Sequence, residues 1–228
     1  MSAALPAAQR LVLFDFDGTL VDSQHSIVAA FTAACRAHGI PGVDPAAIRR
    51  HIGLPLAQAI AANLPEAHRA RAAEVAESYK LAHRALAQSA DHDPLFPGAY
   101  AALDALRAAG ALLGIATGKG RRGLNATLEK RGLGGHFDVL RCADDGPGKP
   151  DPWMVRSALE ELGLGPADAV VVGDTSFDML MARNAGVLGI GAGWGYHAEA
   201  ELVAAGAAAV VPTFDALLAA LRARGFGR

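Results

Sequence analysis

The sequence has few of the features that mark secreted, membrane-bound or nucleic-acid-binding proteins. Its two cysteines, Cys35 and Cys142, lie far apart and form no CxxC pair, so a disulfide framework is not expected. No apolar run approaches the about 20 residues that span a bilayer, and Met1–Arg10 lacks the cationic start and apolar core of a signal peptide. The net charge of −2 gives no broad basic field. We therefore expect a cytoplasmic protein without nucleic-acid or membrane partners.

What the chain does contain is an apolar, alanine-rich sequence that alternates between two patterns. Hydrophobic residues make up 52% of its 228 residues, which is enough for a sizeable core. Short continuous apolar runs are followed by helical patterns, as in a parallel sheet covered on both faces. The expected strands are Leu11–Phe16, Ala111–Ala116, Val139–Leu140, Ala169–Val172, Val187–Ile190 and Ala209–Val211. The expected helices are Tyr100–Ala109, Arg121–Arg131, Pro152–Leu162, Phe177–Ala185, Ala198–Ala205 and Phe214–Arg224. This pattern predicts an α/β fold with a Rossmann-like parallel sheet.

The segment 24–93 interrupts the alternation because it contains no good strand candidate. Its helical stretches are Ser26–His38, Pro45–His51, Pro55–Asn63 and Glu66–Ala90. We therefore predict a helical insert after the first strand. The α/β core would consist of residues 1–23 and 94–228, with residues 24–93 forming the insert.

Polar residues follow several of the expected strands at the point where each apolar run ends. Carboxylates are costly at the end of a buried strand unless something pairs with them, and a hard cation such as Mg²⁺ suits oxygen ligands. The carboxyl ends of parallel strands meet at the edge of the sheet where ligands bind. The residues expected there are Asp15, Asp17, Thr117, Gly118, Lys149, Asp174 and Asp178. Such a set fits a phosphoryl group with its metal.

These residues resemble the motifs of the haloacid dehalogenase-like (HAD) superfamily, and in particular its phosphoglycolate phosphatase-like group. Asp15-Phe-Asp-Gly-Thr is similar to the first motif, and Ala116-Thr-Gly to the second. Lys149-Pro is similar to the third motif, and Gly173-Asp-Thr-Ser-Phe-Asp to the fourth. The motifs occur in the family's order along the whole core. The helical insert is similar to the family's small α-helical cap domain.

The resemblance implies a role for each matching residue. Asp15 would be the nucleophile that forms an aspartyl-phosphate, and Asp17 would be the acid and base, with a pKa raised by Asp15. Thr117 and Gly118 would bind the phosphoryl group, and Lys149 would hold both that group and Asp15. The Mg²⁺ ligands would be Asp15, the backbone carbonyl of Asp17, and Asp174, while Asp178 would orient metal-bound water or Lys149.

Simpler structural roles are open for several of these residues. Asp174 and Thr117 are also suited to capping a helix, Asp178 to a helix dipole, and Lys149 to the surface. Arg49 could bind the leaving group of the substrate, but a solvated basic helix end is an equally ordinary role for it. We expect Lys119 to occupy the first turn of a helix.

The most concrete expectation is a Mg²⁺-dependent phosphatase that hydrolyses a small phosphate ester, with 2-phosphoglycolate as the first candidate substrate, acting as a monomer or homodimer. A sugar phosphomutase of the β-phosphoglucomutase kind would use the same residues. A haloacid dehalogenase is disfavoured by Asp17, because those enzymes lack a carboxylate at that position. A non-catalytic phosphate-binding module is the remaining alternative.

Overall fold

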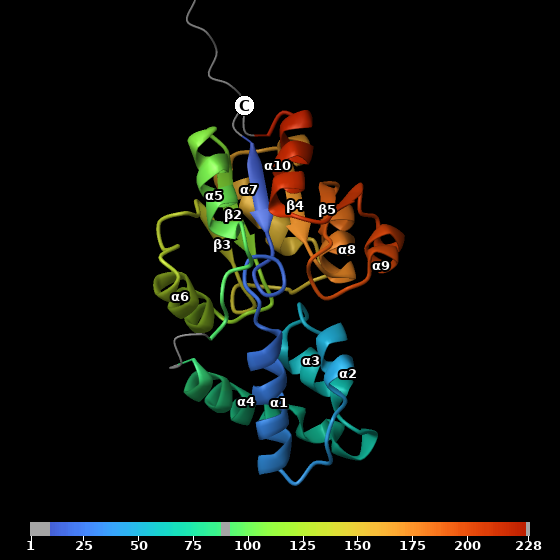
Figure 1. Ribbon diagram of the computed structural model, residues 1–228. Helices are drawn as coiled ribbons and strands as arrows, with labels where there is room; N and C mark the ends of the chain where they lie inside the picture. Colours follow the sequence, from blue (N-terminus) through green and yellow to red (C-terminus); the bar gives the residue numbers. More distant parts are fainter. Residues whose placement is uncertain (1–9, 88–91, 227–228) are drawn as a thin grey trace, which may run out of the picture.

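The computed structural model describes residues 10–87 and 92–226, in which a layered α/β unit carries a separate group of helices (Figure 1). The strands are β1 (Leu11–Phe14), β2 (Leu112–Ala116), β3 (Val139–Arg141), β4 (Ala169–Gly173), β5 (Leu188–Ala192) and β6 (Ala209–Val211). The α-helices of the layered unit are α5 (Ala99–Ala108), α6 (Arg121–Lys130), α7 (Trp153–Leu162), α8 (Ser176–Ala185), α9 (Glu199–Ala205) and α10 (Phe214–Ala223). A short 3₁₀-helix, η2 (Pro166–Asp168), precedes β4.

The strands form one six-stranded parallel sheet in the order β3-β2-β1-β4-β5-β6. The chain builds outward from β1 through β2 to β3, and then returns to β4 on the other side of β1. The sheet therefore changes direction between β1 and β4, which is where ligands bind in open α/β sheets. The expected α/β fold with a Rossmann-like sheet is confirmed.

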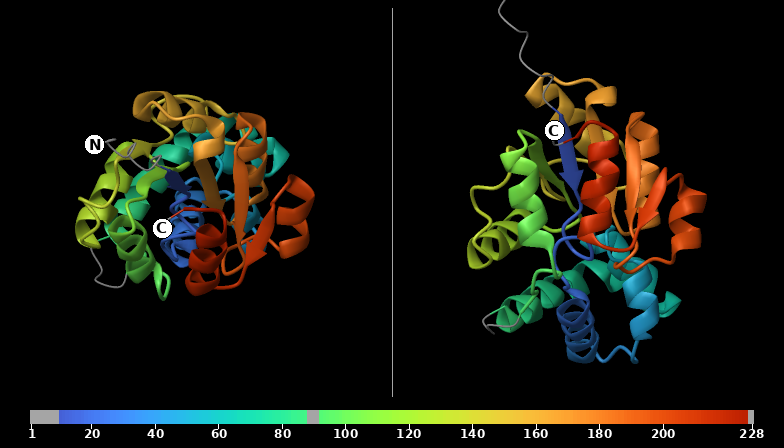
Figure 2. Two further views of the ribbon diagram at one scale, coloured as in Figure 1. Left: turned by 90° about the horizontal axis from the view of Figure 1, so that it is seen from above. Right: turned by 45° about the horizontal axis from the view of Figure 1, so that its top comes forward.

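The side chains of β1 show how the sheet is buried on both faces. Val12 and Phe14 belong to the apolar cluster under α5, α6 and α10, whereas Leu11 and Leu13 belong to the cluster under α7 and α8. All four side chains are fully buried, which explains why the strand is continuously apolar. The helices lie on both sides of the sheet in the two views of Figure 2. Two apolar layers thus hold β1 rigidly at the centre.

The helices between β1 and β2 pack around an apolar cluster of their own that includes Phe31, Ile60 and Val75. They are α1 (Gln24–Ala37), α2 (Pro45–Arg50), α3 (Leu56–Asn63), the 3₁₀-helix η1 (Glu66–Arg71) and α4 (Ala72–Leu86). No helix among the described residues is long and apolar enough to cross a membrane.

The expectation of one helix over Glu66–Ala90 is wrong in its first part, and residues 88–90 of it lie outside the described residues. η1 and α4 divide the stretch. No residue of η1 is buried, whereas α4 buries Val75 and Ala76. Because packing of an apolar face supplies most of the stability of a helix in a protein, the α-helix begins where that face begins.

The inserted helices meet the α/β unit at the carboxyl edge of the sheet. A Cβ atom added at Gly118 would lie 2.7 Å from the carbonyl oxygen of Gly53 and 2.8 Å from that of Leu54. A Cβ added at Gly148 would overlap the ring of Pro55. The loop that contains residues 53–55 therefore rests directly on two core loops, and only glycine allows this close approach.

Candidate active site

Three carboxylates converge at the switch point of the sheet, as expected from the ends of β1 and β4. Potential ligand oxygens of Asp15, Asp174 and Asp178 all lie within 4.8 Å of one another, and all three residues are buried. Asp15 follows β1, Asp174 follows β4, and Asp178 lies in the first turn of α8. Burial of like charges this close is unfavourable without cations to compensate them.

Lys149 supplies one of those cations. Its Nζ atom lies 2.7 Å from Asp15 Oδ1 and 2.6 Å from Asp178 Oδ1, and its side chain has no exposed surface. Burial alone would lower the pKa of Lys149, but the two carboxylates outweigh it and raise the pKa. Lys149 is therefore a charged, buried residue of the carboxylate cluster, and the alternative of a surface lysine is wrong.

Asp15 has one oxygen engaged and one without a partner. Its Oδ1 atom accepts a hydrogen bond from the Phe16 amide at 2.6 Å and also pairs with Lys149. Its Oδ2 atom is buried and has no hydrogen-bond partner among the described residues. Burial, followed by the nearby Asp178 carboxylate, raises the pKa of Asp15 well above its usual value, although Lys149 opposes the shift. Such an orphaned oxygen indicates a site that receives an electrophile or a cation.

Asp174 is held by donors on both of its oxygens. Thr19 Oγ1 donates to Oδ1 at 2.8 Å and the Tyr196 amide donates to Oδ2 at 2.9 Å. Burial and the Asp178 carboxylate raise its pKa to about 7. Thr175 caps α8, so the alternative role of Asp174 as the helix cap is wrong. A Cβ atom at Gly18, whose φ is +89°, would overlap the Asp174 carboxylate.

Asp178 has a double role in the structure. Its Oδ2 atom accepts hydrogen bonds from the Thr175 amide at 3.0 Å and from Thr175 Oγ1 at 2.6 Å, completing a capping box at the start of α8. Its Oδ1 atom contacts Lys149. Asp178 therefore fixes the position of Lys149 and stabilises its own helix.

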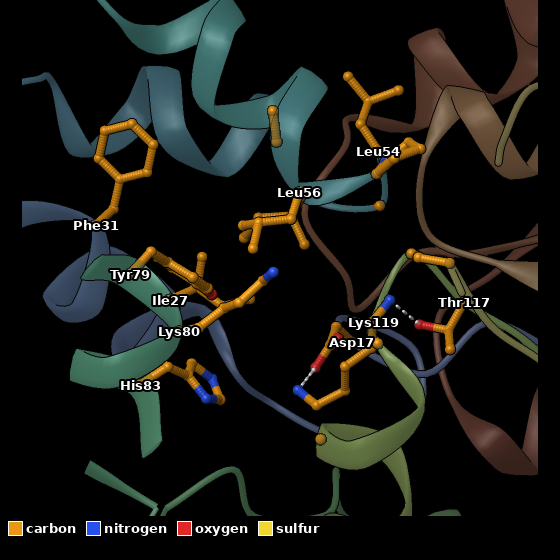
Figure 3. A pocket seen from close by; sticks show the side chains of 18 of the residues that line it. Asp17, Ile27, Phe31, Leu54, Leu56, Tyr79, Lys80, His83, Thr117 and Lys119 are labelled. Carbon is orange, nitrogen blue, oxygen red and sulfur yellow. Dashed lines mark hydrogen bonds and ion pairs between the residues drawn. The ribbon is translucent and has the colours of Figure 1, made fainter. Parts of the chain in front are cut away.

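Asp17 differs from the expectation in its charge environment. Its Oδ1 atom accepts a hydrogen bond from Lys119 Nζ at 2.9 Å (Figure 3), and the Lys119 side chain is only 9% exposed. Burial would raise the pKa of Asp17, but the Lys119 ammonium outweighs burial and lowers the pKa. The expectation that Asp15 raises the pKa of Asp17 is wrong, because the direct contact with the Lys119 ammonium has the larger effect. Lys119 precedes α6 and does not occupy its first turn.

The predicted phosphate-binding loop follows β2. Thr117 is buried and its Oγ1 atom accepts a hydrogen bond from the Lys119 amide at 3.1 Å. Gly118 lies under the loop of the inserted helices. Both residues line the same cavity as Asp15 and Asp17.

That cavity of about 610 Å³ lies between the sheet edge and the inserted helices. Figure 3 shows Phe31, Leu56 and Tyr79 on one side of it, facing Asp17 and Thr117 on the other. Lysines and arginines outnumber carboxylates among the residues that line the cavity. The basic residues are Lys80, Arg84, Lys119, Arg122 and Lys130, and the carboxylates are Asp15, Asp17 and Asp144. Arg49 is not among the lining residues, whereas His51 from the same helix end is.

The fold and the site together place the chain in a known class. The family described as haloacid dehalogenase-like hydrolase matches residues 12–192, so the chain belongs to this family. The match includes both aspartates that follow β1, Thr117, Lys149 and Asp174. The expected family is confirmed.

The chain is also similar to particular named proteins. The probable phosphatase IndB of Dickeya dadantii is 39% identical over 217 residues, covering 93% of this chain and 94% of the relative. The pyrophosphatase PpaX of Bacillus velezensis is 35% identical over 187 residues, covering 80% and 82%. A phosphoglycolate phosphatase of Rhodospirillum rubrum is 36% identical over 219 residues, covering 91% and 89%. Among solved structures, a hydrolase from Pseudomonas syringae superposes with a TM-score of 0.82 at 29% identity, covering 94% and 99%.

Proposed function

We propose that this protein is a phosphomonoester hydrolase in which Asp15 is the nucleophile. The observation that carries the proposal is the Asp15 carboxylate, which lines the cavity. One of its oxygens is fixed by Lys149, and the other has no partner in the part of the chain that the structure describes. A buried, oriented carboxylate with a free oxygen is suited to in-line attack on phosphorus. The relatives named phosphatases support the same chemistry.

The reaction proceeds in two steps in this proposal. Asp15 Oδ2 forms a bond to phosphorus while the bond to the leaving oxygen breaks, and Asp17 gives its proton to that oxygen. Asp17 then takes a proton from the water that attacks the aspartyl-phosphate, which releases phosphate and restores Asp15. Thr117 and the Gly118 amide hold phosphoryl oxygens, and Lys149 offsets their negative charge.

The carboxylate cluster fits Mg²⁺. Three buried carboxylates share one lysine, and an oxygen of Asp15 has no partner among the described residues. Carboxylate and carbonyl oxygens are the ligands that Mg²⁺ takes. Asp15, the Asp17 carbonyl and Asp174 would hold the ion, with Asp178 beside them. When bound, Mg²⁺ would reduce the repulsion between Asp15 and an incoming phosphate.

The inserted helices, residues 24–93, act as a cap that encloses the leaving group in this proposal. The first substrate candidate is 2-phosphoglycolate, in line with the phosphoglycolate phosphatase relative. The cavity favours larger phosphate esters with an apolar body as a second substrate class. Its volume of about 610 Å³ is more than a two-carbon acid fills, and its walls include the apolar side chains of Ile27, Phe31, Leu56 and Ile60. Pockets of roughly 300–1,000 Å³ enclose ligands with an apolar body. Larger esters, including aromatic and sugar phosphates, therefore belong in the test.

The test is phosphate release by the purified protein with Mg²⁺ from a panel of metabolites. The panel contains 2-phosphoglycolate, pyrophosphate, sugar phosphates and aromatic phosphates, compared by kcat/KM. We expect release that EDTA stops and that Asp15→Asn abolishes while the fold is kept. Isomerised sugar phosphate without net phosphate release would show a mutase. No release from any ester, or full activity of Asp15→Asn, would refute the hydrolase proposal.

A further inference from the structure

A second group of buried and partly buried ionisable side chains lies at the cavity, where the inserted helices rejoin the core. It consists of His83 on α4, His92 and Asp93 in the returning segment, and Lys119 in the loop before α6. The Asp93 side chain has no exposed surface, and those of His92 and Lys119 are 5% and 9% exposed. The Lys119 ammonium makes this group unfavourable for a metal ion.

Asp93 joins three parts of the chain through one carboxylate. Its Oδ1 atom accepts a hydrogen bond from Ser26 Oγ on α1 at 2.5 Å. Its Oδ2 atom lies 3.2 Å from His92 Nε2 and 3.6 Å from Lys119 Nζ. Its φ of +51° is the one positive value of a non-glycine residue in the described part of the chain. A strained backbone and a buried charge are both unfavourable, so they persist only where the surrounding structure holds them, which is common at functional sites.

Lys119 contacts Asp17 as well as Asp93. Its Nζ atom therefore lies between two carboxylates, 2.9 Å from Asp17 and 3.6 Å from Asp93. A lysine has a long flexible side chain that loses much rotamer entropy when it is held in one place. The carboxylates of Asp17 and Asp93 attract the ammonium from both sides and offset this entropy loss. The position of the ammonium against Asp17 therefore depends on Asp93.

We propose that Asp93 is a positioning residue for the reaction: it holds Lys119 against Asp17 and so fixes the carboxylate that exchanges protons with the leaving group. The inference rests on the proposed acid and base role of Asp17. It also links the cap to the chemistry, because Ser26 and His83 of the inserted helices contact the same Asp93 carboxylate.

The leaving group provides the test. An alkyl phosphate expels a strongly basic alkoxide that must be protonated as it departs, whereas p-nitrophenyl phosphate expels a stable phenolate that needs little help. The parameter kcat/KM covers the steps up to departure of the leaving group. We expect Asp93→Asn and Lys119→Gln to lower kcat/KM for the alkyl phosphate by about 10–100-fold, because a carboxylate that is not held in place transfers its proton less efficiently. This loss of position outweighs the rise in the pKa of Asp17 that follows when the ammonium is removed or displaced. For p-nitrophenyl phosphate the change is small, and Lys119→Arg restores most of the alkyl activity.

The variants separate the possible outcomes. Asp215→Asn, an exposed carboxylate on α10, is the matched control and leaves both values unchanged. Equal losses on both substrates in Asp93→Asn and Lys119→Gln, with a lower melting temperature, would show a structural hinge and overturn the proposal. If Asp93→Asn fails to fold, Asp93→Glu, which keeps the charge but displaces it from Lys119, takes its place in the same comparison. Asp17→Asn is the reference: loss of equal size on both substrates in that variant would refute the acid role of Asp17 itself.

Discussion

Replacement of Asp174 by asparagine tests the electrostatic cost of assembling the site. Asp174 is fully buried next to two other carboxylates, and Lys149 contacts those two. Asparagine keeps the size of the side chain but cannot ionise. The variant therefore removes the charge of a proposed metal ligand while it changes the packing little. The comparison with the wild type reports the contribution of that charge, including its effect on the pKa of the neighbouring Asp15.

The magnitude follows from the pKa. In the folded protein the pKa of Asp174 rises from 3.8 to about 7 through burial and Asp178. A raised pKa means that the neutral acid is favoured in the fold. This contribution to stability is therefore fully present below about pH 4 and is lost as the pH rises toward 7. At about 1.4 kcal/mol per pH unit, the wild type loses roughly 3 kcal/mol between pH 5 and 8 from this residue.

The assay is urea unfolding at several values from pH 5 to 8 with EDTA present. Burial lowers the pKa of His83 in the folded protein to about 4, so between pH 5 and 8 only the unfolded state changes its protonation at this residue. This contribution is the same in both proteins and cancels in the difference. We expect the stability of Asp174→Asn relative to the wild type to rise by roughly 3 kcal/mol over this range. The loss of one hydrogen bond to Thr19 or the Tyr196 amide adds an offset that does not depend on pH.

A relative stability that stays constant with pH would refute the reasoning. Asp215→Asn, which removes an exposed carboxylate, is the control and gives a flat difference. Added Mg²⁺ is expected to stabilise the wild type more at pH 8 than at pH 5, because the ion competes with protons for the same oxygens.

Two further predictions concern the other supports of the site. Lys149→Met removes the cation between Asp15 and Asp178, so we expect loss of phosphatase activity and about 3–5 kcal/mol of stability in urea unfolding with EDTA at pH 7; an unchanged midpoint would contradict the buried ion pairs. Gly118→Ala places a methyl group against the Gly53 and Leu54 carbonyls, so kcat/KM is expected to fall by about 10–100-fold as the cap loop shifts. An alanine variant with normal kcat/KM would show that the loop contact is dispensable.

Most of the fold could be predicted because the sheet is buried on both faces. Continuous apolar runs such as Leu11–Phe14 and Ala169–Gly173 have few alternatives to a parallel strand. The strand order could not be read from those runs, because the return of the chain to β4 beside β1 is a tertiary choice. The boundary between η1 and α4 could not be predicted for the same reason, because it depends on which residues pack against an apolar neighbour.

The candidate site could be predicted where the family motifs carry it, and not beyond them. Asp15 and Asp174 converge because they follow the neighbouring strands β1 and β4. Lys149 reaches them from the loop that follows β3 at the same edge of the sheet. Lys119 and Asp93 lie outside the four family motifs. Their meeting depends on the path of the returning segment. A signal was present in the sequence, since Lys119 lies only two residues after Thr117, but spacing alone does not separate a buried lysine from a helix's first turn.

The two aspartates after β1 acquire different chemistry because each has its own lysine. Lys149 lies in a cluster with a second and third carboxylate, so the pKa of Asp15 stays raised despite the ion pair. Lys119 dominates the surroundings of Asp17, whose pKa is lowered. Lys119 thus favours the ionised form of Asp17, which can accept a proton. The acid role proposed for Asp17 therefore requires that binding of the phosphate ester offsets the lowering of the Asp17 pKa by Lys119. In the proposed reaction Lys119 therefore acts on Asp17 in two ways: it holds the carboxylate in place, and it favours the ionised form that accepts a proton from water.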